Sequence, residues 1–365
     1  MIKILFFIES LKGGGAEKVL KNLVNAMDTK KFDITVATLY KESVDGELKN
    51  GIKYKYCYKT QSAVSNVMMR VEAAAGVTYR LHLKGDYDIE VAYLECGATK
   101  IIAGSVNKKV KKIAWVHCDL SKKAENYEAF VNDTKKYYEK YDKIVCVSED
   151  VRNSFIKGYG DKFEPVTLYN CYDDSEILNK SKEPLPEEID KDGKICVAVG
   201  RLVKSKGFDK LLKAHKRLLE EGVNHKLWIL GEGEERENLE KYIKDNNLSD
   251  SVTLFGFANN PYKYIKNADI TVCSSEYEGF STVVVESLIL GTPVVTTDCS
   301  GMREILGDSE FGLITENSED GIFCGLKKML TENAVYSQYK EKAAKRGEDF
   351  KIDKAVLKTQ SFFEN

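Results

Sequence analysis

Two glutamates that lie eight residues apart, Glu278 and Glu286, are the side chains of this sequence that point most directly to chemistry. Glu278 lies in an expected turn at 277–281, and Glu286 lies about one turn into an expected helix at 282–290. An apolar strand at 270–273 leads into the turn. This order of strand, turn and helix places both carboxylates at the carboxyl edge of a parallel sheet, where α/β proteins bind ligands.

The start of the same helix offers an anion site. The backbone N–H groups of Ser281 and Thr282 would face a phosphate placed there. Carboxylates beside an anion site suit a ligand that also carries hydroxyl groups, and a nucleotide sugar meets both requirements. The alternative interpretation is that Glu278 caps a turn and Glu286 lies on a solvated helix face.

Further motifs surround the two glutamates. Gly-Phe follows Glu278, Gly-Thr-Pro-Val-Val occupies 291–295, and Arg-Glu-Ile occupies 303–305. Together they resemble the donor-site signature of family 4 retaining glycosyltransferases, and the resemblance extends from residue 1 to about residue 314. It implies the α/β fold called GT-B, in which two Rossmann-like domains with parallel sheets face each other across a cleft and a C-terminal helix crosses back to the first domain.

A glycine-rich turn follows the first expected strand. Gly13, Gly14 and Gly15 lie between a buried strand and a helix, where backbone can approach a ligand closely. The pattern is not Gly-x-Gly-x-x-Gly, which argues against a dinucleotide cofactor. It resembles the Gly-Gly-Ala-Glu turn of the family, which implies that Gly14 and Gly15 border the acceptor and the donor phosphates. The alternative is a tight turn without a ligand.

Two cations lie in the loop at 200–207, after the strand expected at 195–199. Arg201 can grip phosphate oxygens as a fork, and Lys206 adds a mobile point charge. The resemblance implies that Gly200, Arg201 and Lys206 hold the donor diphosphate and replace the metal ion of other glycosyltransferases. We therefore expect no metal and no cofactor beyond the nucleotide-sugar substrate. The alternative is a pair of surface salt-bridge partners.

The remaining site residues come from the same resemblance. His117 closes the strand at 112–117 and is expected to contact the donor sugar or phosphate. Glu278 is expected to bind hydroxyls of the transferred sugar, and Glu286 those of the ribose. The expected catalytic residues are Glu278, His117, Arg201 and Lys206. The expected donor-binding residues are Gly14, Gly15, Gly200, Arg201, Lys206, Gly231, Gly233, Phe280, Ser281, Thr282 and Glu286, with no metal ligand.

Other segments carry weaker signals. The turn containing Gly231 and Gly233 is expected to flank the nucleotide, or to be a plain turn. Glu95, Gly97 and Thr99 follow a strand and are candidate acceptor contacts.

Two stretches have competing interpretations. Asp86 and Asp88 imitate the metal-binding Asp-x-Asp of other glycosyltransferases, but they precede a strand and are expected at the amino edge of the sheet. The stretch 65–84 mixes apolar and basic residues, with Gly76 interrupting its helical pattern. We expect it to pack against its own domain, and the alternative is a helix that lies on anionic lipid.

Composition bounds the class of protein. The 365 residues are 43% hydrophobic and 31% charged, which indicates a globular chain of two domains. Nine cysteines without a Cys-x-x-Cys pair fit a reducing cytoplasm. No signal peptide and no membrane-spanning run is apparent.

Residues 1–170 contain 28 basic and 22 acidic residues, which suits an anionic acceptor or membrane surface. No basic patch is interleaved with stacking aromatic residues, so nucleic-acid binding is not expected.

The expected domains follow the alternation of strands and helices. An acceptor-binding domain covers 1–170 together with a C-terminal helix at about 349–365, a linker covers 171–192, and a nucleotide-sugar-binding domain covers 193–348.

The sequence thus predicts a metal-independent hexosyltransferase that forms an α-linkage. Its donor is expected to be a UDP-hexose or UDP-N-acetylhexosamine. Its acceptor is expected to be a lipid-linked or other glycan of a bacterial capsule, exopolysaccharide or lipopolysaccharide. Cytoplasmic location with peripheral contact to the inner face of the membrane is expected. The alternatives are a non-catalytic GT-B partner subunit and a nucleotide-sugar hydrolase or epimerase.

Overall fold

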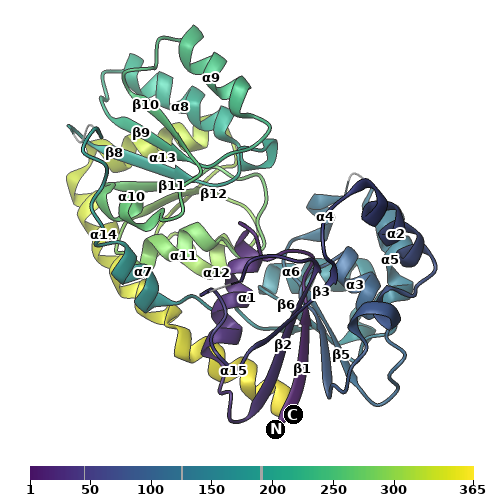
Figure 1. Ribbon diagram of the computed structural model, residues 1–365. Coiled ribbons are helices and arrows are strands. Elements are labelled where there is room, and N and C mark those ends of the chain that lie inside the picture. The colour runs from purple at the N-terminus through teal and green to yellow at the C-terminus, as the bar shows by residue number, and fades with distance from the viewer. Residues whose placement is uncertain (45, 125, 190–191) are drawn as a thin grey trace. The chain divides into compact units, whose positions relative to one another are not determined.

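The computed structural model describes residues 1–44, 46–124, 126–189 and 192–365. Its contacts divide the chain into two compact units (Figure 1). The first unit comprises Met1–Tyr172 together with Ile352–Asn365, and the second comprises Asp173–Lys351. Each unit contains one wholly parallel sheet with helical crossovers, so the predicted α/β architecture is confirmed.

The sheet of the first unit has seven strands in the order β3-β2-β1-β4-β5-β6-β7. These strands are β1 (Ile2–Phe7), β2 (Phe32–Tyr40), β3 (Lys53–Tyr58), β4 (Ile89–Ala92), β5 (Lys111–Val116), β6 (Lys143–Cys146) and β7 (Val166–Thr167). The helices are α1 (Gly15–Ala26), α2 (Ala63–Ala74), the π-helix η1 (Tyr79–Leu83), α3 (Gly97–Ile102), α4 (Leu120–Lys123), α5 (Tyr127–Tyr138), α6 (Glu149–Tyr159), the 3-10 turn η2 (Asp161–Phe163) and α15 (Ile352–Glu364). Because β1, β4 and β5 are neighbours, the loops that follow them share one edge of the sheet.

Apolar packing joins the two ends of the chain in the first unit. Leu5, Phe6 and Phe7 of β1 are fully buried, as expected for a central strand covered on both faces. The ring of Phe363 in α15 lies 5.7 Å from that of Phe6 and 6.3 Å from that of Trp115 in β5. The C-terminal helix is therefore part of the core that the N-terminal strand organises.

The sheet of the second unit has six strands in the order β10-β9-β8-β11-β12-β13. They are β8 (Ile195–Val199), β9 (Lys226–Leu230), β10 (Val252–Gly256), β11 (Ile270–Cys273), β12 (Val294–Thr297) and β13 (Leu313–Thr315). The helices are α7 (Asp174–Lys180), the 3-10 turn η3 (Lys204–Lys206), α8 (Phe208–Glu220), α9 (Arg236–Asp245), α10 (Tyr262–Asn267), α11 (Thr282–Ile289), α12 (Met302–Leu306), α13 (Glu319–Thr331), α14 (Asn333–Gly347) and the 3-10 turn η4 (Glu348–Phe350). The loops after β8, β9 and β11 share the carboxyl edge.

Two local predictions differ from the structure. The interval 171–192, interpreted above as a linker, contains α7, which begins where the Asp173 side chain accepts a hydrogen bond from the Glu176 N–H at 2.9 Å. Ile177 is the one buried residue of this helix, so its sequence shows too little apolar periodicity to reveal it. The sequence pattern also predicts a single helix at 122–140, but the structure has two helices, α4 and α5, because the Asn126 side chain caps the start of α5.

A buried histidine pair lies in the core of the second unit. His215 in α8 is fully buried, and its Nδ1 lies 2.8 Å from Nε2 of His225. The other ring nitrogens lie 2.9 Å from Ser251 Oγ and 2.9 Å from the carbonyl oxygen of Val223. Burial lowers the pKa of His215 to about 3 and also lowers the pKa of His225. Both rings are therefore neutral in the folded protein at neutral pH.

This pair predicts a specific acid sensitivity. Both folded-state pKa values lie below the ordinary value of 6.5, so on acidification the unfolded chain binds protons first. The free energy of unfolding should therefore fall as pH drops from about 6.5 towards about 3, with a slope that approaches roughly 1.4 kcal/mol per pH unit for each histidine. Urea unfolding of the full chain, followed over this range by tryptophan fluorescence, measures the slope. The double variant His215→Gln, His225→Gln should flatten it, and an unchanged slope in that variant would assign the acid sensitivity to other groups.

Candidate functional site

The candidate site of the second unit is built on two loops that are hydrogen-bonded to each other. Ser274, directly after β11, donates from Oγ to the carbonyl oxygen of Lys206 at 2.7 Å. The N–H of Glu276 donates to the carbonyl oxygen of Ser205 at 2.8 Å. At Gly207, φ is +62° and an added Cβ would lie 2.2 Å from the carbonyl oxygen of Ser274. A larger residue at 207 would separate the loop that carries Lys206 from the loop after β11.

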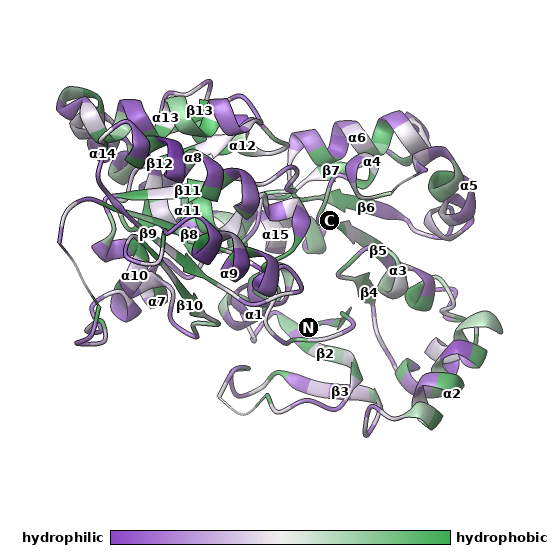
Figure 2. Cartoon of the chain, turned by 90° about the horizontal axis from the view of Figure 1, so that it is seen from above, coloured by the Kyte–Doolittle hydropathy of each residue, from purple (hydrophilic) through white to green (hydrophobic). Residues whose placement is uncertain are grey.

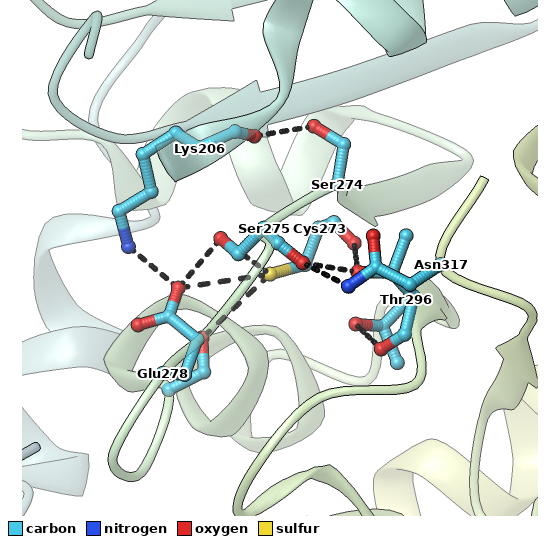
Figure 3. Close-up of polar contacts among 9 residues, drawn as sticks. Lys206, Cys273, Ser274, Ser275, Glu278, Thr296 and Asn317 are labelled. Carbon is cyan, nitrogen blue, oxygen red and sulfur yellow. Dashed lines mark hydrogen bonds and ion pairs between the residues drawn. The ribbon is translucent and has the colours of Figure 1, made fainter. Parts of the chain in front are cut away.

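An ion pair joins the lysine of one loop to the glutamate of the other (Figure 3). Lys206 Nζ lies 2.5 Å from Glu278 Oε1, and Ser275 Oγ donates to the same oxygen at 2.7 Å. Burial alone would lower the pKa of Lys206, but the Glu278 carboxylate more than offsets it, so the pKa is raised and the ammonium stays charged. The predicted residues Lys206 and Glu278 are thus in direct contact.

Two residues that the sequence analysis did not identify hold the turn before Glu278. Thr297 Oγ1, at the end of β12, donates to the carbonyl oxygen of Ser275 at 2.6 Å. Asn317 Nδ2, just after β13, donates to the carbonyl oxygen of Ser275 at 3.2 Å (Figure 3). It also donates to the carbonyl oxygen of Glu276 at 3.2 Å. The available signal was their position, because both are polar residues at the carboxyl ends of strands.

The helix that carries Glu286 begins as predicted. Ser281 occupies the N-cap position of α11 and makes no side-chain hydrogen bond to the helix. Glu286 is 3% exposed, and its Oε1 accepts a hydrogen bond from the Tyr262 hydroxyl at 3.3 Å. Phe280 is also buried, and its ring lies 6.2 Å from that of Phe350, so it contributes to packing at the helix start. Thr282, the first residue of α11, is half-buried.

The glycines of the turn after β9 have a packing role. An added Cβ on Gly231 would lie 1.8 Å from the carbonyl oxygen of Gly200, and one on Gly233 would lie 2.3 Å from that of Leu202. Gly200 itself, in the same loop, is hydrogen-bonded to the carbonyl oxygen of Leu230 at 3.0 Å. Close contact between two backbone segments therefore accounts for Gly231 and Gly233 without a ligand, in line with the plain-turn alternative.

Arg201 is exposed beside these loops. Its positive charge acts to lower the pKa of Lys206, which shows that the two cations are near each other. Within the part of the chain that the structure describes, the Arg201 guanidinium forms no ion pair, whereas Lys206 is paired with Glu278. Two neighbouring cations with one carboxylate leave a positive charge that an anion would neutralise.

The predicted residues of the first unit also gather at one sheet edge. Glu95, after β4, is 4% exposed and accepts hydrogen bonds at 3.0 Å from the N–H of His117 and at 3.0 Å from the thiol of Cys118. The His117 ring lies 4.8 Å from that of Tyr93. Burial lowers the pKa of His117 to about 4, although the Glu95 carboxylate opposes the shift. The imidazole is therefore neutral at neutral pH, and its Nε2 is buried without a hydrogen-bond partner among the described residues.

The glycine turn at 13–15 and the acceptor candidates Gly97 and Thr99 contact different parts of the first unit. Gly14 is the N-cap of α1 and lies against the Glu17 side chain, and Gly15 is the first residue of that helix. The Glu9 carboxylate lies against Gly97, so an added Cβ there would be 1.9 Å from it. Thr99, in contrast, is 2% exposed and donates to the carbonyl oxygen of Leu94 at 3.1 Å, which is a structural role.

The Asp-x-Asp pattern lies where the sequence placed it. Asp88 Oδ2 accepts a hydrogen bond from the N–H of Lys3 at 2.8 Å, and Asp86 pairs with the Lys3 ammonium at 2.5 Å. Lys3 belongs to the first half of β1, so both aspartates lie at the amino edge of the sheet. Glu95 and His117 follow their strands and lie at the opposite edge.

Comparison with known proteins identifies the family. The family Glycosyl transferases group 1 matches residues 179–346. A Campylobacter jejuni enzyme, N-acetylgalactosamine-N,N'-diacetylbacillosaminyl-diphospho-undecaprenol 4-alpha-N-acetylgalactosaminyltransferase, is 31% identical over 370 residues, which cover 98% of this chain and 99% of that one. The chain belongs to the group 1 glycosyltransferase family. The predicted resemblance to family 4 enzymes with the GT-B fold is thereby confirmed.

Other relatives and solved structures agree. The amylovoran biosynthesis glycosyltransferase AmsD of Erwinia amylovora is 21% identical over 364 residues, covering 96% of each chain. The crystal structure of Anabaena HepE in complex with UDP and glucose has a TM-score of 0.80 at 16% identity and covers both chains fully. At this identity the structural match shows the shared fold, and the sequence relatives show that this chain is a glycosyltransferase.

The support given by Asn317 leads to a testable prediction. Asn317→Ala removes two hydrogen bonds to the turn before Glu278, each worth about 1 kcal/mol, so kcat/KM for sugar transfer should fall by at least about tenfold while the protein stays folded. Asn238→Ala is the control, because that exposed side chain on α9 donates to Glu235 at 3.1 Å, outside the candidate site, and should leave the rate unchanged. Equal rates in the two variants would remove Asn317 from the site.

Proposed function

We propose that this glycosyltransferase is a retaining, metal-independent hexosyltransferase that uses a UDP-sugar and forms an α-linkage in surface polysaccharide biosynthesis. The observation that supports it best is the joined pair of loops that holds Lys206 against Glu278, with Arg201 and the start of α11 on the same edge. This arrangement supplies cations and backbone N–H groups for a diphosphate together with a carboxylate for sugar hydroxyls.

The proposed chemistry follows from the charges. When the bond between the sugar and the diphosphate breaks, negative charge grows on the leaving phosphate oxygens. Arg201 and Lys206 stabilise this charge, and cations already in place contribute several kcal/mol, because they need no reorganisation during the reaction. Glu278, held by Ser275, orients the transferred sugar through its hydroxyl groups, and Glu286 binds those of the ribose. Retention of the anomeric configuration is proposed from the family resemblance.

The acceptor is proposed from the relatives. The Campylobacter relative, which matches over nearly all of both chains, is named for a diphospho-undecaprenol acceptor and a 4-alpha linkage. A Rhizobium meliloti relative, 29% identical over 207 residues covering 56% of this chain and 59% of that one, is named as a lipopolysaccharide core enzyme. These names support a lipid-linked glycan acceptor for this chain. His117 and the Gly14–Gly15 turn are proposed to border the sugar and phosphates.

A donor panel tests the proposal. Purified protein is incubated with UDP-, GDP-, ADP- and dTDP-sugars in the presence of EDTA and a membrane extract that supplies acceptor. One UDP-sugar should release its diphosphate with EDTA present, and the anomeric configuration of the product, read by NMR, should match that of the donor. Turnover that requires added Mg²⁺ or Mn²⁺ would contradict metal independence, and release of free sugar without transfer would indicate a hydrolase. No donor binding by calorimetry would indicate a non-catalytic partner.

If Lys206 binds the donor phosphate, its substitution should lower kcat far more than substitution of Lys204, which lies in the same 3-10 turn. Lys206→Ala should lower kcat by roughly 10²–10³, because the cation acts on charge that develops during the reaction. Lys204→Ala is the matched control, since this exposed lysine of the same 3-10 turn should leave kcat within about twofold. If both variants lose activity equally, the effect belongs to the turn as a whole and not to the ammonium of Lys206.

A further inference from the structure

Helix α2 is attached to the first unit through polar side chains. The Tyr40 hydroxyl donates to Asn66 Oδ1 at 2.6 Å, and the Tyr58 hydroxyl donates to Glu72 Oε2 at 2.6 Å. His82 Nε2 lies 2.8 Å from the same Glu72 oxygen. At its start, Ser62 and Ser65 form a reciprocal capping box. These polar contacts hold the helix in place, together with Met69, which packs against the core of the unit.

Four large apolar residues of α2 face away from the unit. Val64, Val67, Met68 and Val71 are 70%, 59%, 49% and 62% exposed, and α2 contains no buried residue. They occupy positions i, i+3, i+4 and i+7, which places all four on one face of the helix. Figure 2 shows α2 at the margin of its unit with hydrophobic segments along its length. We call these four residues the α2 apolar face.

This orientation is the reverse of the usual one. A surface helix ordinarily turns its apolar stripe to the core and its polar side to water. The expectation that the stretch 65–84 packs against its own domain is confirmed for Met69, Tyr79 and Leu83, which contact or belong to the apolar core of the first unit. It does not hold for the α2 apolar face, because periodicity shows that a helix has an apolar face but not which way that face points. Tyr40, Tyr58 and His82 supply polar partners that favour the polar side of α2.

The charges around this face are nearly all positive. The stretch 59–84 contains four basic residues and one acidic residue. The acidic residue, Glu72, is turned inward to Tyr58 and His82. The basic residues Lys59, Arg70, Arg80 and Lys84 are exposed, and so is Leu81, at 60%, in η1. Apolar side chains bordered by exposed cations match a bilayer surface, whose acyl chains accept the former and whose anionic headgroups attract the latter.

We propose that the α2 apolar face is a membrane-docking surface that inserts its valines and methionine among the headgroups of an anionic bilayer, with the four basic residues bound to lipid phosphates. The inference goes beyond the proposed function, since it concerns lipid and not the sugar donor. A lipid-linked acceptor would give such docking a purpose, but vesicle binding is measured without any sugar chemistry, so either proposal can fail without the other.

The test is co-sedimentation of the full chain with vesicles of phosphatidylcholine alone or mixed with phosphatidylglycerol. Wild-type protein should bind the mixed vesicles, more weakly at high salt because screening shortens the reach of the cations. The triple variant Val64→Ser, Val67→Ser, Val71→Ser should bind at least about tenfold less, since each substitution removes apolar area from the contact. The double variant Arg80→Gln, Lys84→Gln should lose about fivefold per charge, only on mixed vesicles.

Controls keep the result specific. Leu357→Ser changes an equally exposed leucine on α15, and Lys30→Gln changes an exposed lysine after α1; both should bind vesicles like wild type. All substituted side chains are exposed, so thermal unfolding should be unchanged and a loss of binding would not reflect misfolding. The proposal is overturned if wild-type protein binds neither vesicle, or if the triple variant binds mixed vesicles as well as wild type does. A concentration-dependent dimer that the triple variant abolishes, without vesicle binding, would assign the face to a second copy of the chain.

Discussion

Close contact between backbone segments is the constraint on which the candidate site of the second unit depends. Three loops after neighbouring parallel strands meet so tightly that side chains at Gly207, Gly231 and Gly233 would collide with carbonyl oxygens. Backbone hydrogen bonds tie the same loops together, from Leu202 to Glu232 and from Glu276 to Ser205. Because the loops cannot separate, the lysine of one and the glutamate of another are held in contact. The ion pair is a result of this packing and not its cause, since exposed or partly exposed pairs contribute little to stability.

In the first unit, two loops after neighbouring strands are also held together, but a side chain joins them and not close backbone contact at glycines. The carboxylate of Glu95 accepts hydrogen bonds from the backbone of His117 and the thiol of Cys118, and so joins the loop after β4 to the loop after β5. Burial keeps the His117 imidazole neutral, although the Glu95 carboxylate opposes this shift of its pKa. A neutral imidazole can donate one hydrogen bond and accept another, which suits contact with an uncharged sugar better than attraction of an anion.

The sequence predicted the elements well because both sheets are parallel and buried. Runs such as Ile195–Val199 and Ile270–Cys273 are apolar apart from Thr271 and are bounded by polar turns, so their limits agree with the structure. Helix α7 was not predicted, because it buries a single residue. The outward orientation of the α2 apolar face was not predicted either, because residues distant in sequence determine it. The contact of Lys206 with Glu278 joins residues 72 positions apart, and the support from Asn317 comes from a third strand end. Such relations depend on strand order, which one sequence without relatives does not specify.

The pairing of Lys206 with Glu278 has a consequence for how any anion is held and released. An ammonium that already has a carboxylate beside it does not meet an incoming phosphate as a bare charge; it exchanges one anionic partner for another. The exchange lowers the net free energy gained when the anion binds, and this applies to a reaction product as much as to a substrate. After a phosphate leaves, Glu278 can pair again with Lys206 as it does in this structure, at 2.5 Å, so the partly buried ammonium is not left unpaired. Under the proposed function, the pair would act as an internal counterion that favours release of the diphosphate over tight binding.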